Sequence, residues 1–555
     1  MKKTVLLILI IGFLLPATAH EAMAANYNPV VRIGLYFGSS TLISANLENE
    51  RGSGYNLGWF DSSYEFIPVG WTEVQRVTTM KDKNIFLQSG NYYDTPLAGE
   101  YSVIGAYHLQ ASSVYSTFEE ALAAAESFSG IIPSFPAYID GQYRVRMGSF
   151  TSVEAAQAKA AELGYTLSTV VGNSPTCYTL TETRTANILF EFDYSGRTAF
   201  GIMPDITGDS DPQTWFKNNT YRGGFEYKRL SGNDITVINY VRLQDYVKGI
   251  LPYEMSSSWP MEALKAQALC AKGYTLSNMG KHSVSGFDLC NTTDCQVYRG
   301  TYYASSNSDK AVDDTYGEFL LYNGEHVCAY YHSCDGGATE DACNVWGKDI
   351  PYLKGVIDPY EDIGKTWRLE LTLEQLNWLA GAKGYSFGNL VNIYVSETTP
   401  MGNVRSITLV NSSGKSYSLS GEAARTFFYT PTLGNTITSQ RYTITPKYDR
   451  PVGSPVYING ASYSLKSLKG VYAIGGSGKA QLTGDSAVVI TGSGNAEVTA
   501  SGADVPPIGF TISGSGYGHN IGMSQWGAYA MAQKGFTYDQ ILKFYYTGVT
   551  IGSLG

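Results

Sequence analysis

The segment best suited to chemistry is Leu251-Pro252-Tyr253-Glu254-Met255, which sets one carboxylic acid among apolar side chains. A helix of about twenty residues is predicted directly after it, because apolar side chains recur on one face of residues 261–275. Ser258 is the expected cap of this helix, and Pro260 suits its first turn. Glu254 would then lie in a rigid loop at a helix entrance.

A glutamate in such a loop could protonate the leaving oxygen of a glycosidic bond. Its ordinary pKa near 4.3 would have to rise toward roughly 6, and burial among apolar neighbours acts in that direction. Hydrolysis usually takes a second carboxylate, and none is clearly placed beside Glu254. The nearest candidates are Asp335, Glu340 and Asp341.

A glycine-rich stretch, residues 514–528, contains His519, Ser524 and Gln525. Glycines let a backbone approach a ligand closely, and these polar side chains could bind the hydroxyl and acetamide groups of a sugar. A phosphate-binding loop is not favoured, because no lysine follows the glycines. Asn520 in this stretch tolerates a left-handed backbone.

A second polar stretch runs from His332 to Thr339. A hydrolase triad of His332, Ser333 and Asp335 is not favoured, since neighbours in sequence give no evidence of a triad in space. We expect His332, Ser333 and Thr339 to bind substrate, with Gly336 and Gly337 shaping the turn.

Composition and the N-terminus indicate an exported, multi-module protein. The chain has 555 residues, 43% of them apolar, and a net charge of −10, which makes nucleic acid and anionic membranes poor partners. Residues 1–24 have the charged start, apolar run and small-residue cleavage site of a signal peptide. No later stretch is apolar enough to span a membrane, so an uncleaved signal would be the only anchor.

Residues 98–172 carry a weak internal repeat of a strand followed by an alanine-rich helix. The expected helix caps are Thr117 with Glu120 and Thr151 with Glu154. The Gly-Ser-Phe strand end at residues 148–150 and the helix start after it resemble a SPOR domain. That resemblance implies binding to peptidoglycan strands whose stem peptides have been removed; the alternative is a generic α/β insertion.

Three blocks of sequence resemble the SpoIID/LytB family of stage II sporulation protein D and its relatives. They are residues 243–274, residues 287–347 and residues 514–528, which include Leu-Pro-x-Glu-Met, Asp-Cys-Gln-Val-Tyr, His-Ser-Cys-Asp-Gly-Gly and Gly-His-Asn-Ile-Gly-Met-Ser-Gln-Trp-Gly. The resemblance implies non-hydrolytic cleavage between N-acetylmuramic acid and N-acetylglucosamine of peptide-stripped strands, which leaves a 1,6-anhydro end. Glu254 would act first as acid and then as base, because the 6-hydroxyl of the muramic acid attacks. It also implies the substrate contacts Gln267, Tyr298, His332, Ser333, Gly336, Gly337, Thr339, His519, Ser524 and Gln525.

The seven cysteines leave two alternatives open. His282, Cys290 and Cys295 could hold a structural zinc ion, as some relatives are thought to do, or the two cysteines could form a disulfide in an exported protein. Asp294 stands where relatives often have histidine, which departs from the zinc pattern. No cofactor is required by the expected reaction.

The predicted fold is α+β: a β-rich catalytic domain with a few helices, an inserted α/β SPOR-like module and a late β insertion. The predicted parts are the signal peptide (1–24), an N-terminal β region that begins the catalytic domain (25–97), the SPOR-like module (98–172), the catalytic domain (178–445), a Gly/Ser-rich β insertion (446–508) and the end of the catalytic domain (509–555).

The sequence therefore favours an extracellular, wall-associated lytic transglycosylase that works with a cell-wall amidase. Two alternatives remain open: a non-catalytic wall-binding enhancer of an amidase, and a protein that only binds glycan.

Overall fold

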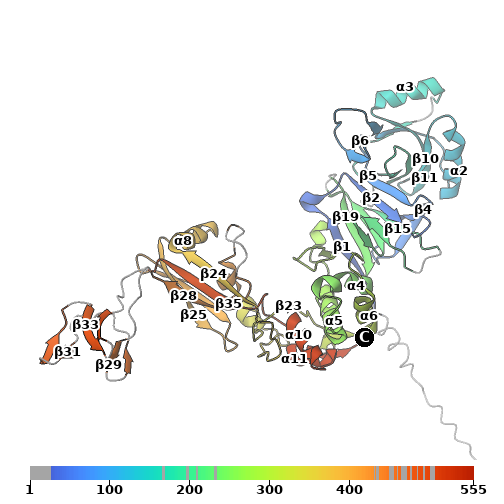
Figure 1. Ribbon diagram of the computed structural model, residues 1–555. Helices are drawn as coiled ribbons and strands as arrows, with labels where there is room; N and C mark the ends of the chain where they lie inside the picture. The colour runs from blue at the N-terminus through green and yellow to red at the C-terminus, as the bar shows by residue number, and fades with distance from the viewer. Residues whose placement is uncertain are drawn as a thin grey trace, which may run out of the picture. The chain divides into compact units, whose positions relative to one another are not determined.

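The computed structural model (Figure 1) describes residues 27–49, 51–165, 169–195, 199–207, 211–230, 234–429, 432, 437–448 and 507–554, with residues 482 and 483 and six strands between 456 and 499. The predicted signal peptide, 1–24, lies outside the described residues. Within the described part, no helix is long and apolar enough to cross a membrane.

The fold is mixed α+β and rich in strands, as the sequence predicts. The chain divides into two compact units. Unit 1 runs to Ala329 and takes in Thr550–Gly555 again at the end, while unit 2 is Tyr330–Val549. The inserted SPOR-like module remains a prediction.

Unit 1 contains a seven-stranded sheet that joins the start of the chain to the Glu254 region. Its β1 pairs antiparallel with β19, with Val31 opposite Val241, and β19 runs directly into α4. Val31 is fully buried, because alternate residues of β1 face the core. The strand order is β20 (Leu289–Cys290), β1 (Val30–Tyr36), β19 (Thr236–Arg242), β18 (Gly224–Lys228), β15 (Ala199–Pro204), β3 (Tyr55–Phe60) and β4 (Phe66–Thr72).

Three helices that pack together, α4 (Leu243–Glu254), α5 (Met261–Ser277) and α6 (Ser306–Asp314), follow from this sheet. The expected loop around Glu254 is wrong: Pro252 lies inside α4, and Glu254 is its last residue. The expected cap is also wrong, because Pro260 is the N-cap of α5 and Ser258 lies two residues before it. The middle of α5 is buried on nearly all sides rather than on one face.

Unit 1 also contains a ten-stranded sheet. Its order is β12 (Thr169–Gly172), β9 (Tyr107–Gln110), β11 (Gln142–Phe150), β10 (Ser134–Ile139), β14 (Ile188–Asp193), β13 (Tyr178–Glu182), β5 (Arg76–Lys81), β2 (Ser44–Asn49), β16 (Thr214–Phe216) and β17 (Asn219–Tyr221). Since β10 pairs in parallel with β14, residues 98–172 share one sheet with the strands on either side of them in sequence.

Helices α2 (Phe118–Ser129) and α3 (Val153–Leu163) pack on the strands of residues 98–172. Thr117 caps α2 as predicted, but Ser152 rather than Thr151 caps α3. The first strand of the repeat is also displaced, because β8 (Ser102–Ile104) belongs to a separate sheet with β6 (Ile85–Gln88) and β7 (Asn91–Tyr93).

Unit 2 has a core between two three-stranded sheets and short helices. The sheets are β24 (Thr366–Thr372), β35 (Gly509–Ser515) and β28 (Arg441–Lys447), and β25 (Leu390–Thr398), β26 (Val404–Asn411) and β27 (Ser416–Ser420). The helices are α7 (Ala342–Trp346), α8 (Leu373–Ala382), α9 (Glu422–Thr426), α10 (Gln525–Gln533) and α11 (Tyr538–Tyr545). A capping box of Thr537 and Gln540 starts α11.

In the segment between β28 and β35, where the β insertion is predicted, the described strands pair antiparallel as three hairpins. They are β29 (Val456–Ile458) with β30 (Ala461–Tyr463), β31 (Tyr472–Gly475) with β32 (Gly478–Gln481), and β33 (Ser486–Thr491) with β34 (Gly494–Thr499). Because β28 and β35 pair with each other, the hairpins extend from a connection between neighbouring strands.

Candidate functional site

Glu254 is half-buried and forms the C-terminal end of α4. Met255 leaves the helix in an extended conformation, and its N–H donates to the Leu251 carbonyl. A helix C-terminus carries the negative end of the helix dipole, which disfavours an ionised carboxylate. The same apolar neighbours that were predicted for a loop therefore surround an acid at a helix end.

The residue before Glu254, Tyr253, begins a chain of three tyrosine rings in unit 1. The ring of Tyr253 meets that of Tyr303 edge-on at 4.9 Å between centroids, and Tyr303 meets Tyr302 at 4.7 Å. Tyr302 and Tyr303 are 58% and 56% exposed. Asn307 donates from Nδ2 to the Ser257 carbonyl at 2.6 Å, which ties their loop to the turn after Glu254. Exposed aromatic rings with polar tips suit a sugar.

Two predicted substrate contacts in unit 1 are buried instead. Gln267 is 0% exposed within α5, and Tyr298 is 1% exposed, with its hydroxyl donating to Asn239 Oδ1 at 2.9 Å. Gly249 lets the Tyr298 segment reach α4, because a Cβ there would lie 2.4 Å from the Tyr298 ring. Both side chains are therefore buried against α4 and α5 and do not lie at a surface.

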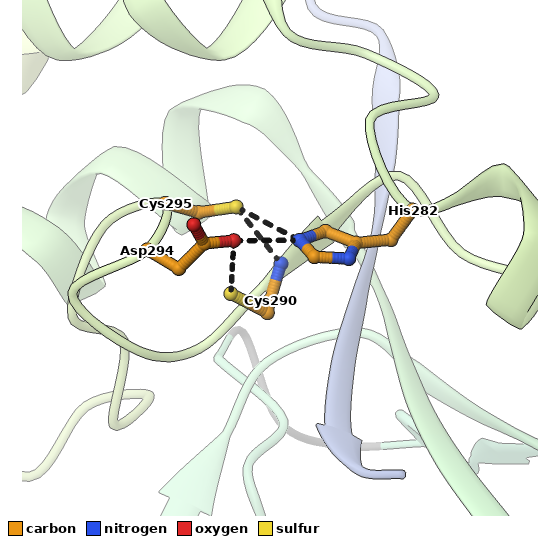
Figure 2. Close-up of side chains that lie close together, drawn as sticks. All are labelled: His282, Cys290, Asp294 and Cys295. Carbon is orange, nitrogen blue, oxygen red and sulfur yellow. Dashed lines mark hydrogen bonds and ion pairs between the residues drawn. The ribbon is translucent and has the colours of Figure 1, made fainter. Parts of the chain in front are cut away.

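The residues predicted to bind zinc lie together, with Asp294 as a fourth member (Figure 2). His282 Nε2 is 3.3 Å from Cys295 Sγ and 3.2 Å from Asp294 Oδ2, and Cys290 Sγ is 3.9 Å from Asp294 Oδ2. Strand β20 fixes Cys290 by pairing in parallel with β1, and Asp288 anchors the same strand through an ion pair with Arg32 at 2.8 Å.

This donor set fits zinc. Imidazole, thiolate and carboxylate are its protein ligands, and bonds of about 2.0 to 2.3 Å set tetrahedral ligand atoms roughly 3.3 to 3.8 Å apart. A hydrogen bond from Cys295 lowers the pKa of Cys290 to about 5, and that bond and burial raise the pKa of Cys295. All seven cysteines are free thiols in the structure, so the alternative disulfide is not formed.

In unit 2 the two polar stretches of the sequence lie side by side. Strand β23 (Tyr331–His332) pairs in parallel with β36 (Met523–Ser524), with His332 opposite Ser524. Gly518 permits this close approach, because a Cβ there would lie 2.5 Å from the Cβ of His332. Asn520 has φ of 62°, as predicted, and its side chain donates to the Asp335 carbonyl at 3.0 Å.

The two histidines of this cluster are neutral. Burial lowers the pKa of His332 to about 4, and burial and the neighbouring His332 lower the pKa of His519. Their ring centroids lie 5.5 Å apart. His332 is 5% exposed and its Nδ1 contacts the Ile521 carbonyl, whereas His519 is half-buried. His519 is therefore the better placed of the two for a ligand.

The other predicted contacts of unit 2 differ in exposure. Ser333 and the left-handed turn glycines Gly336 and Gly337 are half-buried. Thr339, Ser524 and Gln525 are 0%, 0% and 8% exposed. Ser524 caps α10 and donates to Glu361, and Thr339 accepts from Val356 N–H. The prediction that these last three contact substrate is not supported by their internal placement.

Of the three candidates for a second carboxylate, Asp335 and Glu340 are buried, and Asp341 is half-buried. Glu340 is 1% exposed and accepts from Thr399, Asn403 and Asn344. Asp341 caps α7. Asp335 is fully buried, and burial beside Glu361 and Asp358 raises its pKa to about 9.

Sequence reasoning missed two supporting groups. Glu361 accepts from Asp335 N–H, Gly336 N–H and the Ser524 hydroxyl, so it joins both polar stretches. Lys272 is 1% exposed on α5, donates to the Thr315 carbonyl at 2.5 Å, and has its pKa lowered by burial to about 8. A lysine inside an apolar helix was the available signal for Lys272; nothing in the sequence pointed to Glu361.

Comparison with known proteins identifies the family. The family model described as stage II sporulation protein (SpoIID) matches residues 231–322. An uncharacterized protein of Brachyspira hyodysenteriae is 33% identical over 319 residues, 57% of this chain and 68% of that protein. The amidase enhancer of Bacillus subtilis is 33% identical over a match that covers 55% of this chain and 40% of the enhancer. Stage II sporulation protein D of Bacillus subtilis is 25% identical over a match that covers 57% of this chain and 75% of that protein. The chain belongs to the SpoIID family.

Proposed function

We propose that the protein is a peptidoglycan lytic transglycosylase that acts on strands whose stem peptides have been removed. The observation that carries the proposal is the half-buried Glu254 at the end of α4, whose neighbour Tyr253 contacts the exposed ring of Tyr303. Membership of the SpoIID family supports it, as do the buried positions of Asp335 and Glu340, two of the other candidate carboxylates.

In this reaction the Glu254 carboxyl gives its proton to the oxygen that links muramic acid to the next glucosamine. The bond between that oxygen and the anomeric carbon of the muramic acid breaks. The Glu254 carboxylate then takes the proton of the muramic acid 6-hydroxyl, while the oxygen of this hydroxyl bonds to the anomeric carbon. The proton count balances, no water enters, and the product ends in a 1,6-anhydro ring. One carboxyl group suffices, because the substrate supplies the nucleophile.

The matched test compares Glu254→Gln with Glu262→Gln, which changes a partly exposed glutamate in the first turn of α5. Each full-length protein is incubated with amidase-treated and untreated peptidoglycan, and the new ends are identified by mass spectrometry. We expect anhydro ends from the wild type and Glu262→Gln, chiefly on treated material, and none from Glu254→Gln. Reducing ends would mean hydrolysis, and no cleavage by the wild type would refute the proposal.

A second function, enhancement of an amidase, is favoured by the similarity to a protein named amidase enhancer. Adding the protein to a purified amidase and measuring the release of stem peptides tests it. If release rises equally with wild type and Glu254→Gln, enhancement does not depend on cleavage.

We also propose that His282, Cys290, Asp294 and Cys295 hold a structural zinc ion. Bound zinc would cross-link the segment 282–295. The chain's own part is to present the four ligands from β20 and the turns beside it. No catalytic role is assigned to the site.

A further inference from the structure

Unit 2 carries a groove of about 670 Å³ on the sheet β24-β35-β28. Its polar lining consists of Thr366, Arg368, Arg441, Thr443, Ser513 and Ser515. This volume lies in the range of small-ligand sites. Nothing in the proposed cleavage reaction uses these residues.

The strand register explains why these six side chains share one face. Ser515 stands between Thr366 and Arg441, and two residues along, Ser513 stands between Arg368 and Thr443. Side chains two apart on a strand point to the same side of the sheet. The row between them contains Tyr442, which is 5% exposed in the core on the opposite face.

The charges on this face leave a positive excess. Glu370 accepts from Arg368 at 2.6 Å and from Lys447 at 2.6 Å, so one carboxylate serves two cations. Arg441 donates from Nη1 to the Met401 carbonyl at 2.7 Å and, among the described residues, has no carboxylate partner. The whole chain is acidic, with a net charge of −10, so a local cationic face is not the general character of its surface.

The guanidinium of Arg441 is also left open by its neighbours. A Cβ on Gly402 would lie 3.3 Å from both Nη1 and Nη2, and a Cβ on Gly337 would lie 3.9 Å from Nη2. Both positions are glycine, so backbone rather than side chain borders the group. A planar guanidinium of this kind suits bidentate binding of a carboxylate.

We propose that this groove binds muramic acid residues of the glycan through their free lactyl carboxylate, with Arg441 as the anion-binding residue and the Ser and Thr hydroxyls facing the sugar. The proposal rests on the proposed function and explains its substrate preference. In intact peptidoglycan the lactyl carboxyl is an amide and carries no charge. Water must first cleave that amide, leaving a carboxylate on the sugar and an amine on the peptide, so an amidase reaction supplies the ligand.

The test measures binding by full-length Glu254→Gln, which does not consume the ligand. The probes are a GlcNAc-MurNAc tetrasaccharide with free lactyl carboxylates, the same tetrasaccharide with both lactyl groups as methylamides, and a tetramer of N-acetylglucosamine. We expect the free acid to bind about tenfold more tightly than the other two. Arg441→Gln should reduce that preference about tenfold. The control is Arg405→Gln, which changes an exposed arginine of β26 that pairs with Glu397 of β25 and should leave the preference intact.

Ser513→Asp is the second variant, because it adds a negative charge to the groove without removing the Arg441 contact to Met401. It should weaken binding of the free acid and spare the neutral tetramer. An unchanged preference in both Arg441→Gln and Ser513→Asp would overturn the inference. Anhydro ends produced by the wild type are measured in parallel and separate the two proposals. If the wild type cleaves but the variants keep the preference for the free acid, only the groove proposal is refuted. If the variants lose that preference but the wild type produces no anhydro ends, only the proposed reaction is refuted. Equal binding of tetragalacturonate would mean general anion binding and would also overturn it.

Discussion

The carboxyl groups of Glu254 and Asp335 lie in different surroundings, and the difference separates their roles. Glu254 is half-buried at the end of a helix. Asp335 is wholly buried and shares its space with Asp358 and Glu361. Both residues belong to motifs that suggested chemistry. Their different exposure, which results from the packing of the fold, distinguishes Glu254 as the candidate acid from Asp335 as a supporting residue.

The tyrosine rings beside Glu254 lead to a prediction about substrate binding. Changing Tyr302 and Tyr303 together to Ala should raise KM for denuded strands about tenfold, since two aromatic contacts are lost, and leave kcat within about twofold. Tyr316→Ala, an exposed tyrosine beyond the other end of α6, is the control. An unchanged KM would remove these rings from the binding site.

Asp335 predicts how stability depends on pH. Its pKa rises from the ordinary 3.8 to about 9 in the folded protein, so between these values the folded state binds the extra proton. The free energy of unfolding should therefore fall as pH rises from about 4 to 9. Asp335→Asn, which keeps a donor but cannot ionise, should flatten this slope in urea denaturation measured from pH 5 to 9. The exposed neighbour Asp362→Asn should keep the slope; equal slopes in all three proteins would contradict the prediction.

At the scale of elements, the zinc segment predicts a measurable dependence on metal. Removing metal with a chelator, or changing Cys290 to Ser, should lower Tm by several degrees, because the bound ion would cross-link residues 282–295. Cys343→Ser, an exposed cysteine on α7, should leave Tm and its response to chelator unchanged. Metal analysis of the purified protein should find about one zinc per chain, lost in Cys290→Ser.

Sequence periodicity predicted the existence of elements better than their boundaries. The helix at 261–277 and the cap at Thr117 follow local rules, so they are found as expected. The stretch 243–254 misled, because Pro252 suggests a loop, whereas the helix continues through Pro252 and ends two residues later at Glu254, although a proline there cannot donate the usual i→i−4 hydrogen bond. Caps shifted by one residue, as at Ser152, reflect a choice between adjacent hydroxyls that sequence alone leaves open.

In the candidate site, contacts between residues close in sequence could be predicted, whereas contacts between residues far apart in sequence could not. Cys290, Asp294 and Cys295 are close in sequence, so their cluster with His282 could be predicted. The pairing of His332 with Ser524 joins residues far apart in the chain, and only the fold brings them together. The burial of Tyr298 and Thr339 could not be foreseen, because their motifs resemble binding motifs whether they face a ligand or a core.

At the scale of the whole molecule, the chain leaves unit 1 at Ala329 and returns to it only at Thr550. The returning segment forms β37 (Thr550–Gly552), which pairs antiparallel with β21 (Phe319–Tyr322), itself paired with β22 (Glu325–His326). Leu320, opposite Ile551, is fully buried. Unit 1 is therefore completed by a strand that follows unit 2 in the sequence.

Deleting residues 550–555 should loosen β21 without disturbing unit 2. Loss of β37 leaves β21 with one partner and removes backbone hydrogen bonds worth roughly 1 kcal/mol each, so amide exchange in residues 319–322 should become about tenfold faster. Hydrogen exchange followed by mass spectrometry measures this directly, with β24 and β35 of unit 2 as internal references. Deleting only residues 553–555 spares β37 and is the matched control. Equal exchange of β21 in all three proteins would show that unit 1 holds this strand without the C-terminal segment.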